Sequence, residues 1–125
     1  MTVITVVYGL PFIGVTLYAN NQRLQLENVL LDTGSAASVF RTDDLLWIGV
    51  TIQPQDRIRF MSGIGGREAV IEKQIEKIEV GTLNATPFSI QLGALDYGFP
   101  INGILGADFL MRTHAIVDFQ ALQVW

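Results

Sequence analysis

The chain contains no cysteine and only one histidine, His114, in 125 residues. The absence of cysteine excludes disulfides, thiol catalysis and zinc–thiolate sites. One histidine cannot build a histidine-rich metal site, and no Gly-x-Ser-x-Gly turn accompanies it to suggest a serine triad. We therefore expect His114 to be an ordinary core or turn residue, and the sequence indicates no metal and no other cofactor.

Charged residues are also scarce. They make up only 16% of the chain, the net charge is −4, and no basic run occurs. Phosphate binding needs clustered lysine and arginine, so a nucleic-acid partner is not expected. Hydrophobic residues make up 50% of the chain. With so few charges, some apolar surface is expected to meet a partner, most simply a second copy of the chain.

Long apolar runs are missing as well. The first residues, Met1 to Tyr8, are apolar and β-branched, but they have no basic leader and are too short to cross a membrane. They predict a first strand rather than a signal peptide or a membrane segment, and cytoplasmic residence is the default expectation. The length of the chain fits one compact domain over residues 1–125.

What the chain does contain is a series of strand patterns separated by turn residues. Asn20-Asn21 predicts a hairpin turn, because asparagine tolerates positive φ. A short helix is predicted over Asp44 to Ile48, with acidic residues at its N-terminal end. The fold class is therefore all-β with one or two short helices. Strands are predicted at Thr2 to Val7, Ile13 to Tyr18, Arg23 to Leu31, Ile58 to Phe60, Phe88 to Leu92 and Ala115 to Phe119.

Residues 71–78 fit two kinds of secondary structure. Ile71, Ile75 and Ile78 are spaced as on one face of a helix, but Ile71 and Ile75 also alternate with polar neighbours as in a strand. Gly81 to Asn84 is typical of a hairpin turn, and a hairpin requires a strand before the turn. Two strands with a kink are therefore the preferred interpretation.

The most informative motif is Leu-Leu-Asp-Thr-Gly-Ser at residues 30–35. Asp32 follows two large apolar residues, so a buried strand delivers a carboxylate to its own end. Burial of an ionised carboxylate is costly unless the group is hydrogen-bonded, paired or exposed in a cleft. Asp32 is either a functional carboxylate or the cap of an Asx-turn, and Thr33, Gly34 and Ser35 suit a sharp turn in both cases.

Two glycine motifs follow. Residues 60–67 read Phe-Met-Ser-Gly-Ile-Gly-Gly-Arg and predict a hairpin tip that is either simply flexible or a lid over a cleft. Residues 103–110 read Gly-Ile-Leu-Gly-Ala-Asp-Phe-Leu and predict a turn into a short helix whose apolar residues face inward. Gly106 allows another backbone to pass closely. Asp108 is interpreted as a first-turn acid that complements the helix dipole.

In their order and spacing, the motif at Asp32, Ser38-Val39, the glycine-rich hairpin and Ile-Leu-Gly resemble the retroviral-type (retropepsin-like) aspartic proteases. The resemblance implies a mostly antiparallel, closed β fold, a β-barrel, in which one subunit supplies half of an active site. It therefore implies a homodimer. The activity that it implies is that of an aspartic endopeptidase, acting on a peptide or protein substrate without a cofactor.

The same resemblance assigns roles to the motif residues. Asp32 would be the catalytic carboxylate, and Thr33 would interlock with its symmetry mate beneath the dyad. Gly34 would present its backbone amide and carbonyl near the carboxylate and the substrate. The hydroxyl of Ser35 is a candidate hydrogen-bond partner of the Asp32 carboxylate.

The remaining expectations concern substrate and dimer contacts. The hairpin over residues 60–67 would be a flap, and Tyr97 and Phe99 are interpreted by position as lining apolar substrate pockets. The termini, Thr2 to Val7 and Ala121 to Trp125, are apolar enough to form the interdigitated dimer sheet of viral members. The candidate flap and substrate-binding residues are Met61, Ser62, Gly63, Ile64, Gly65 and Gly66.

The chemistry of carboxylates explains a dimer independently. Peptide hydrolysis needs one group to deprotonate a water while another gives a proton to the carbonyl oxygen. Two carboxylates about 3 Å apart share one proton, and their pKa values split. Asp43, Asp44 and Asp56 lie in polar segments, so Asp32 from two chains supplies the pair. The rival hypotheses are a catalytically silent dimeric peptide-binding module of the same fold, and a small β-barrel ligand binder with a fortuitous Asp-Thr-Gly.

Overall fold

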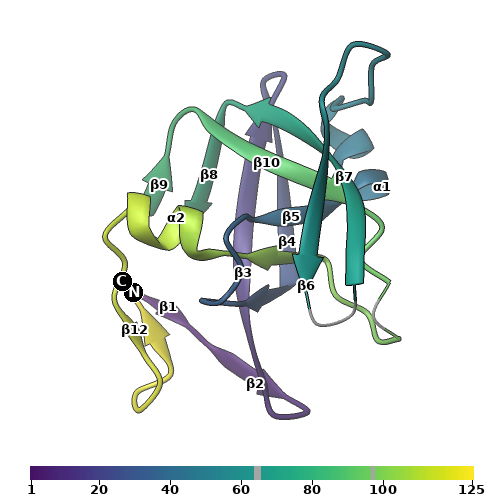
Figure 1. The fold of residues 1–125 in the computed structure, drawn as a ribbon. Helices are drawn as coiled ribbons and strands as arrows, with labels where there is room; N and C mark the ends of the chain where they lie inside the picture. Colours follow the sequence, from purple (N-terminus) through teal and green to yellow (C-terminus); the bar gives the residue numbers. More distant parts are fainter. Residues whose placement is uncertain (64–65, 97) are drawn as a thin grey trace.

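The computed structural model of the chain describes residues 1–63, 66–96 and 98–125. Most of these residues lie in strands, with short helices between them, so the all-β prediction is confirmed (Figure 1). No helix among the described residues is long and apolar enough to span a membrane. The helices are α1 (Thr42–Leu45), the 3-10 helix η1 (Leu46–Ile48) and α2 (Ala107–Arg112). The strands are β1 (Thr2–Val3), β2 (Thr5–Val7), β3 (Leu10–Ala19), β4 (Gln22–Leu31), β5 (Val39–Arg41), β6 (Ile58–Gly63), β7 (Gly66–Ile75), β8 (Lys77–Val80), β9 (Leu83–Ala85), β10 (Phe88–Gly93), β11 (Gly103–Leu105), β12 (Val117–Asp118) and β13 (Gln123–Val124).

The main sheet follows the order β6-β7-β10-β5-β11-β4-β3-β8-β9, with β2 added beside β3. Most neighbours are antiparallel, but β10 pairs with β5 and β11 pairs with β4 in parallel. β6 and β9 end the path, because each belongs to a hairpin that pairs on one side only. The expectation of a closed β fold is therefore corrected: no closed barrel is seen among the described strands.

The hairpin of β3 and β4 follows its sequence pattern closely. Alternate residues along most of β3 are buried, as expected for a strand with one face on the core. Ala19 pairs with Gln22 across the turn. Both turn residues, Asn20 and Asn21, have positive φ, at 53° and 58°. The predicted two-residue asparagine turn is confirmed.

The ambiguous segment over residues 71–78 consists of the end of β7 and the start of β8. Glu76 separates the two strands, and its N–H donates to the carbonyl oxygen of Tyr18 at 2.9 Å. Ile75 and Ile78 are 2% and 0% exposed, so both sides of the break contribute to the core. The choice of two strands with a kink is confirmed.

Several short elements differ from the sequence prediction. β5, β11 and β13 were not predicted, and the strand predicted over Ala115 to Phe119 is reduced to β12. The predicted first strand is divided into β1 and β2, because Ile4 turns into the core between them and is 2% exposed. His114 lies in the turn after α2 with a φ of 56° and is exposed, which fits a turn residue.

The apolar core has two parts. The larger contains Leu17, Phe40, Ile90 and Phe109, all 0% exposed. Leu110 is also buried in it, so α2 turns its apolar residues inward as predicted. The smaller, called the second cluster below, links the β6–β7 hairpin to β5 and β11. It comprises Phe12, Val39, Val70, Leu95, Ile101 and Ile104, with Leu10, Leu30 and Met61 partly buried against it.

Both termini lie in a separate three-stranded sheet of order β1-β13-β12, called the terminal sheet below (Figure 1). Thr2 pairs with Val124 and Val3 with Gln123, so the two ends of one chain pair with each other. Val124 is 1% exposed and belongs to the larger core. In this structure the terminal strands are thus paired within the chain rather than interdigitated with a second chain.

Candidate active site

Asp32 lies directly after the last residue of β4, where β4 runs parallel to β11. Its N–H donates to the carbonyl oxygen of Leu105 at 3.0 Å, which holds the strand end against β11. The side chain is partly exposed. Its Oδ1 accepts a hydrogen bond from the N–H of Gly34 at 3.0 Å. The carboxylate is therefore oriented by the backbone of its own turn.

The rest of this turn consists of small residues. Thr33 and Gly34 are exposed at its tip. The Ser35 N–H donates to the Asp32 carbonyl oxygen at 3.1 Å and closes the turn. The Ser35 hydroxyl donates to the carbonyl oxygen of Ala37 at 2.8 Å. In this structure that hydroxyl stabilises the following loop, and the hydrogen bond to the Asp32 carboxylate comes from the Gly34 backbone instead.

Gly106 lies where the turn after Asp32 crosses the chain between β11 and α2. A Cβ atom at Gly106 would lie 2.7 Å from the carbonyl oxygens of both Ser35 and Ala37. The N–H of Ala107 donates to the Ser35 carbonyl oxygen, also at 2.7 Å. The prediction that Gly106 permits the close passage of another backbone is confirmed.

Asp108 was interpreted as an acid that complements the helix dipole, and in the structure it also accepts hydrogen bonds from Ser38. It is an acid in the first turn of α2, as expected, but its carboxylate also binds Ser38. Oδ2 accepts from the Ser38 N–H at 3.0 Å, and Oδ1 accepts from the Ser38 hydroxyl at 2.7 Å. Ser38 is 0% exposed. Sequence reasoning noted both residues, but no spacing indicated that they would be partners.

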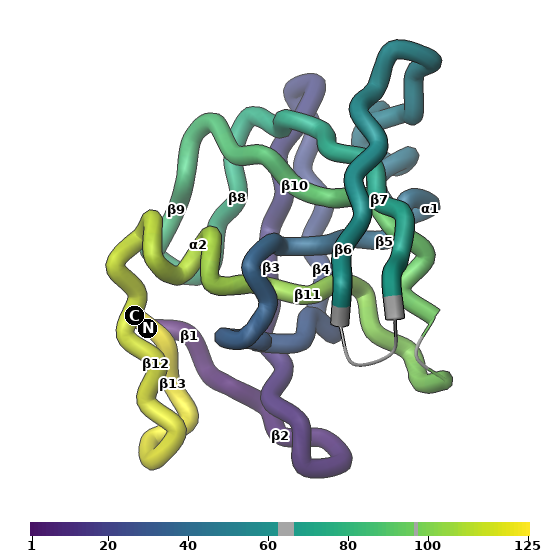
Figure 2. The backbone as a smooth tube through the Cα atoms, viewed as in Figure 1, coloured from purple at the N-terminus to yellow at the C-terminus, as the bar shows by residue number. Residues whose placement is uncertain are grey.

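The glycine-rich hairpin is formed by β6 and β7, with Gly63 opposite Gly66. The predicted flap residues Ile64 and Gly65 lie outside the described residues. In Figure 2 the free ends of β6 and β7 are directed toward the same side of the molecule as the dark-blue segment that follows β4. This placement is compatible with a hairpin that covers the region of Asp32.

The two faces of β6 have different environments. Met61 is partly buried against the second cluster. Its neighbours Phe60 and Ser62 are exposed, and the Arg67 guanidinium lies over the Phe60 ring, 4.6 Å from its centroid. Among the described residues predicted to form a flap, Met61 therefore faces the rest of the chain.

The loop between β10 and β11 contains Tyr97 and Phe99, which were interpreted as lining apolar substrate pockets. Tyr97 lies outside the described residues, and Phe99 is 37% exposed. The same loop contributes Leu95 and Ile101, which are 4% and 2% exposed, to the second cluster. Sequence reasoning missed these two residues, because isolated apolar residues in a loop have no periodic pattern.

A charged pair lies at the base of the hairpin. Lys73 of β7 donates to both carboxylate oxygens of Asp56, each at 3.0 Å. The Gln53 N–H donates to Oδ2 of Asp56 at 2.6 Å. These hydrogen bonds, first from Gln53 and then from Lys73, hold the pKa of Asp56 below its usual range. The Lys73 and Asp56 side chains are only 18% and 13% exposed, so the pair fastens the preceding loop to β7.

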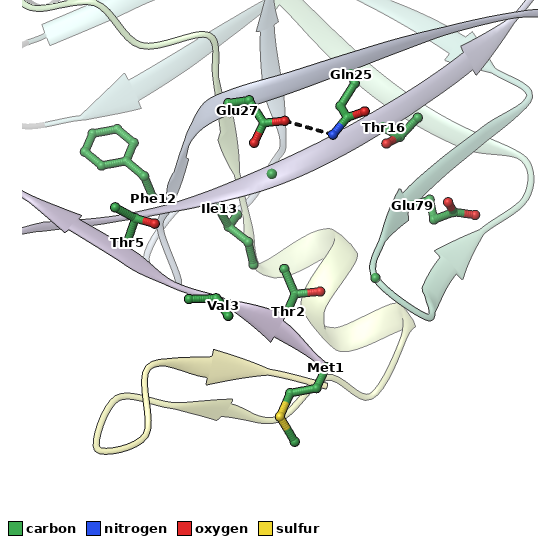
Figure 3. A pocket seen from close by; sticks show the side chains of 12 residues that line it. Met1, Thr2, Val3, Thr5, Phe12, Ile13, Thr16, Gln25, Glu27 and Glu79 are labelled. Carbon is green, nitrogen blue, oxygen red and sulfur yellow. Dashed lines mark hydrogen bonds between the residues drawn. The ribbon is translucent and has the colours of Figure 1, made fainter.

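A pocket of about 490 Å³ is formed mainly by the first strands together with β3 and β4 (Figure 3). Neither Asp32 nor the rest of its turn lines this pocket. The lining residues are Met1, Thr2, Val3, Thr5, Phe12, Ile13, Gly14, Thr16, Gln25, Glu27, Glu79 and Gly81.

In the described parts of the chain, no group of three or more histidine, cysteine or acidic side chains could hold a metal ion.

These features together define the aspartic-protease class: a strand end that carries Asp-Thr-Gly, bonded to an Ile-Leu-Gly segment and accompanied by a glycine-rich hairpin. A family model described as aspartyl protease matches residues 15–109. The chain therefore belongs to this aspartyl protease family, which is part of the retropepsin-like clan. A comparison with curated proteins found no match.

Proposed function

We propose that the protein is an aspartic endopeptidase, active as a homodimer in which Asp32 of two subunits forms the catalytic dyad. The observation that carries the proposal is the geometry of Asp32. Its carboxylate is partly exposed at the end of a buried strand and is held by the Gly34 N–H at 3.0 Å. Membership of an aspartyl protease family supports peptide hydrolysis as the reaction class.

In the proposed reaction one Asp32 is ionised and the other is protonated. The ionised carboxylate takes a proton from water as the water oxygen attacks the peptide carbonyl carbon, while the protonated carboxyl gives its proton to the carbonyl oxygen. The tetrahedral intermediate then collapses and the C–N bond breaks. The leaving nitrogen takes the proton that came from water, while a hydroxyl of the intermediate returns its proton to the other carboxylate, so a carboxylic acid is formed and the dyad again holds one proton. One chain contains a single Asp-Thr-Gly, so the second carboxylate comes from a second copy.

The terminal sheet provides a surface for this dimer. Successive residues of a strand point to opposite faces, so Met1, Val3, Ile116 and Trp125 lie on the face opposite to the buried Val124. We call these four residues the outer terminal face. They are 69%, 66%, 52% and 40% exposed, in that order. Gln123 and Asp118 lie on the same side of the sheet. The four exposed apolar side chains beside them support association with a second copy.

The proposed substrate is an extended peptide beneath the β6–β7 hairpin, with residues 60–67 acting as a flap. Leu30 and Met61 are only partly buried against the second cluster. Leu30 lies two residues before Asp32, and Met61 lies on the hairpin, so both present apolar surface to the region between them. This supports apolar side chains in the substrate next to the cleaved bond.

A catalytically silent peptide-binding or dimerisation module of the same fold is the alternative. Such a module needs Asp32 only as the acceptor of the Gly34 N–H, a cap that asparagine would provide as well. The intact Asp-Thr-Gly turn therefore supports the enzyme.

The substitution Asp32→Asn tests the proposal. Asparagine keeps the size of the side chain and an acceptor for the Gly34 N–H, but it cannot exchange the proton that catalysis requires. We expect the variant to fold and dimerise, and to cleave a diverse peptide mixture at least about 100-fold more slowly than wild type. Mass spectrometry of the products, from acidic to neutral pH, measures this loss.

Asp43→Asn is the matched control, because Asp43 is an exposed acid in the first turn of α1. It should retain the wild-type rate. Unfolding of Asp32→Asn would instead identify Asp32 as a structural residue. A well-folded wild-type dimer that cleaves no peptide would favour the silent module.

A further inference from the structure

A hydrogen-bond network joins the loop after Asp32 to the start of α2. The Gly106 N–H donates to Ser38 Oγ at 3.0 Å, and the Ser38 hydroxyl donates to Asp108 Oδ1 at 2.7 Å. The Ser38 N–H donates to Asp108 Oδ2 at 3.0 Å. The Phe109 N–H adds a further bond to Oδ1 at 2.9 Å. We call this network the Ser38–Asp108 clamp.

The clamp needs a carboxylate and not only a negative charge. Each oxygen of Asp108 accepts a hydrogen bond from a different donor of Ser38, and an ionised carboxylate is an acceptor at both oxygens. Asparagine would direct its NH₂ group at one of these donors and lose that bond. Complementing the helix dipole, by contrast, needs charge near the helix start without this geometry. The two roles of Asp108 can therefore be separated by experiment.

The clamp lies next to the two segments that hold the Asp32 turn in place, which are the loop after the turn and the end of β11. Ser38 follows the turn in the sequence, and Gly106 follows Leu105, whose carbonyl oxygen accepts the Asp32 N–H. We propose that Asp108 is a positioning residue, which acts through Ser38 to hold the Asp32 turn in the geometry that the dyad requires. This proposal rests on the endopeptidase function proposed above.

The physical reason is the short distance over which two carboxylates share a proton. In a symmetric dimer, a shift of the Asp32 turn occurs in both subunits and changes the carboxylate separation from both sides. A misplacement of about 1 Å can lower the rate of an enzyme about 100-fold. Because Asp108 and Ser38 hold the backbone and do not meet the substrate, their loss should affect turnover more than substrate binding.

The test compares Asp108→Asn, Ser38→Ala and the control Asp43→Asn, with rates expressed per folded dimer. Asp43 is also a first-turn acid of a short helix, so it controls for the helix dipole. We expect kcat to fall about 10- to 100-fold in both clamp variants, with KM changed less than about twofold. Asp43→Asn should match wild type. The double clamp variant should lose no more than the larger single loss, because both changes break one network.

The pH profile distinguishes positioning from stability. Weaker coupling between the two Asp32 carboxylates brings their apparent pKa values together, so the bell-shaped dependence of kcat on pH should narrow in both clamp variants. A wild-type kcat and pH profile in Asp108→Asn would overturn the proposal. Additive losses in the double variant would also overturn it.

Amide hydrogen exchange gives a measurement that needs no activity. Exchange of the Asp32 amide should accelerate at least about tenfold in both clamp variants but not in Asp43→Asn. If wild type cleaves no peptide, the proposed function fails, while accelerated exchange still supports the clamp. Unchanged exchange overturns the clamp whatever the activity. If Asp108→Asn does not fold, Ser38→Ala serves for the same measurements.

Discussion

Glycines at the two ends of β11 are needed because other parts of the chain pack closely against them. Gly103 begins β11 and Gly106 follows it. Neither position has room for a side chain. A Cβ atom at Gly103 would lie 2.5 Å from Cδ1 of Phe40, and one at Gly106 would lie 2.7 Å from the Ser35 and Ala37 carbonyl oxygens. The backbone of Gly106 is extended, at φ −100° and ψ −178°. The requirement for glycine at this position is therefore steric and not conformational.

The substitution Gly106→Ala follows from this packing. We expect it to lower the free energy of unfolding by about 1–3 kcal/mol, because the carbonyls of the Asp32 turn must move away from the new methyl group. Cleavage should fall with it, since the same carbonyls belong to the loop that carries Asp32. Chemical denaturation and peptide cleavage measure the two effects.

Gly14→Ala is the matched control for that substitution. A Cβ atom at Gly14 would approach chiefly Oε2 of the exposed Glu27 side chain, at 3.2 Å, and that side chain can move. A change in stability within about 0.5 kcal/mol is expected. Equal losses in the two variants would show that the crossing at Gly106 is not specially crowded.

At the scale of secondary-structure elements, the β6–β7 hairpin depends on its base. β7 pairs with β10 along one side, whereas β6 ends the sheet and pairs only with β7. The loop before β6 is fastened by Asp56, which bonds to Lys73 and to the Gln53 N–H. This contact fixes where the hairpin leaves the rest of the chain.

The Asp56 contact predicts a pH dependence of stability. The pKa of Asp56 is lowered in the folded protein, so the unfolded chain binds its proton more readily than the folded chain. The contact therefore stabilises the fold above the ordinary aspartate pKa of about 4 and is lost as the pH falls through the lower folded value. Wild type should be more stable than Asp56→Asn at neutral pH, and the difference should shrink below about pH 4.

Urea unfolding of both proteins between neutral pH and about pH 2 measures this difference. Asp43→Asn again serves as a control, and its difference from wild type should stay small across the range. A stability difference between wild type and Asp56→Asn that does not depend on pH would contradict the assignment.

At the scale of the whole molecule, the terminal sheet is the surface through which the proposed dimer would form. In Figure 2 the terminal sheet lies at the lower left, and the dark-blue segment after β4 lies to its right, at about the height of the two termini. The outer terminal face exposes four apolar side chains beside Gln123 and Asp118, whereas its opposite face is anchored in the larger core through Val124. A dimer built on this side would bury exposed apolar surface and complete the proposed dyad in one step.

The substitution Ile116→Asp tests this arrangement. A carboxylate on the outer terminal face should raise the dimer dissociation constant at least about tenfold, because burial of an unpaired charge is unfavourable. Specific activity should then rise with enzyme concentration over a higher range than in wild type, since half-sites are inactive. Analytical ultracentrifugation and activity over a dilution series measure both effects.

Ile52→Asp provides the comparison. Ile52 is 49% exposed in the loop between η1 and β6, which lies at the opposite end of the molecule in Figure 2. The substitution Ile52→Asp should leave the dimer dissociation constant unchanged. Turnover by a demonstrated monomer at a rate independent of concentration would contradict the two-aspartate dyad itself.

Local patterns were sufficient for the β3–β4 hairpin and for the position of Asp32. The β3–β4 hairpin, the kinked strands around Glu76 and the inward-facing residues of α2 all follow from alternation, turn residues and glycine placement, which are properties of neighbouring residues. The Asp-Thr-Gly turn was recognisable for the same reason, because a strand and the turn that ends it are continuous in the chain.

The short elements and their partners depended on tertiary structure. β5, β11 and β13 have two or three residues each, too few to show a period, and they become strands only because neighbours pair with them. The open sheet, the pairing of the two termini and the hydrogen bonds from Ser38 to Asp108 join residues far apart in the chain. Such contacts depend on how the whole chain packs, and no local pattern of residues specifies them.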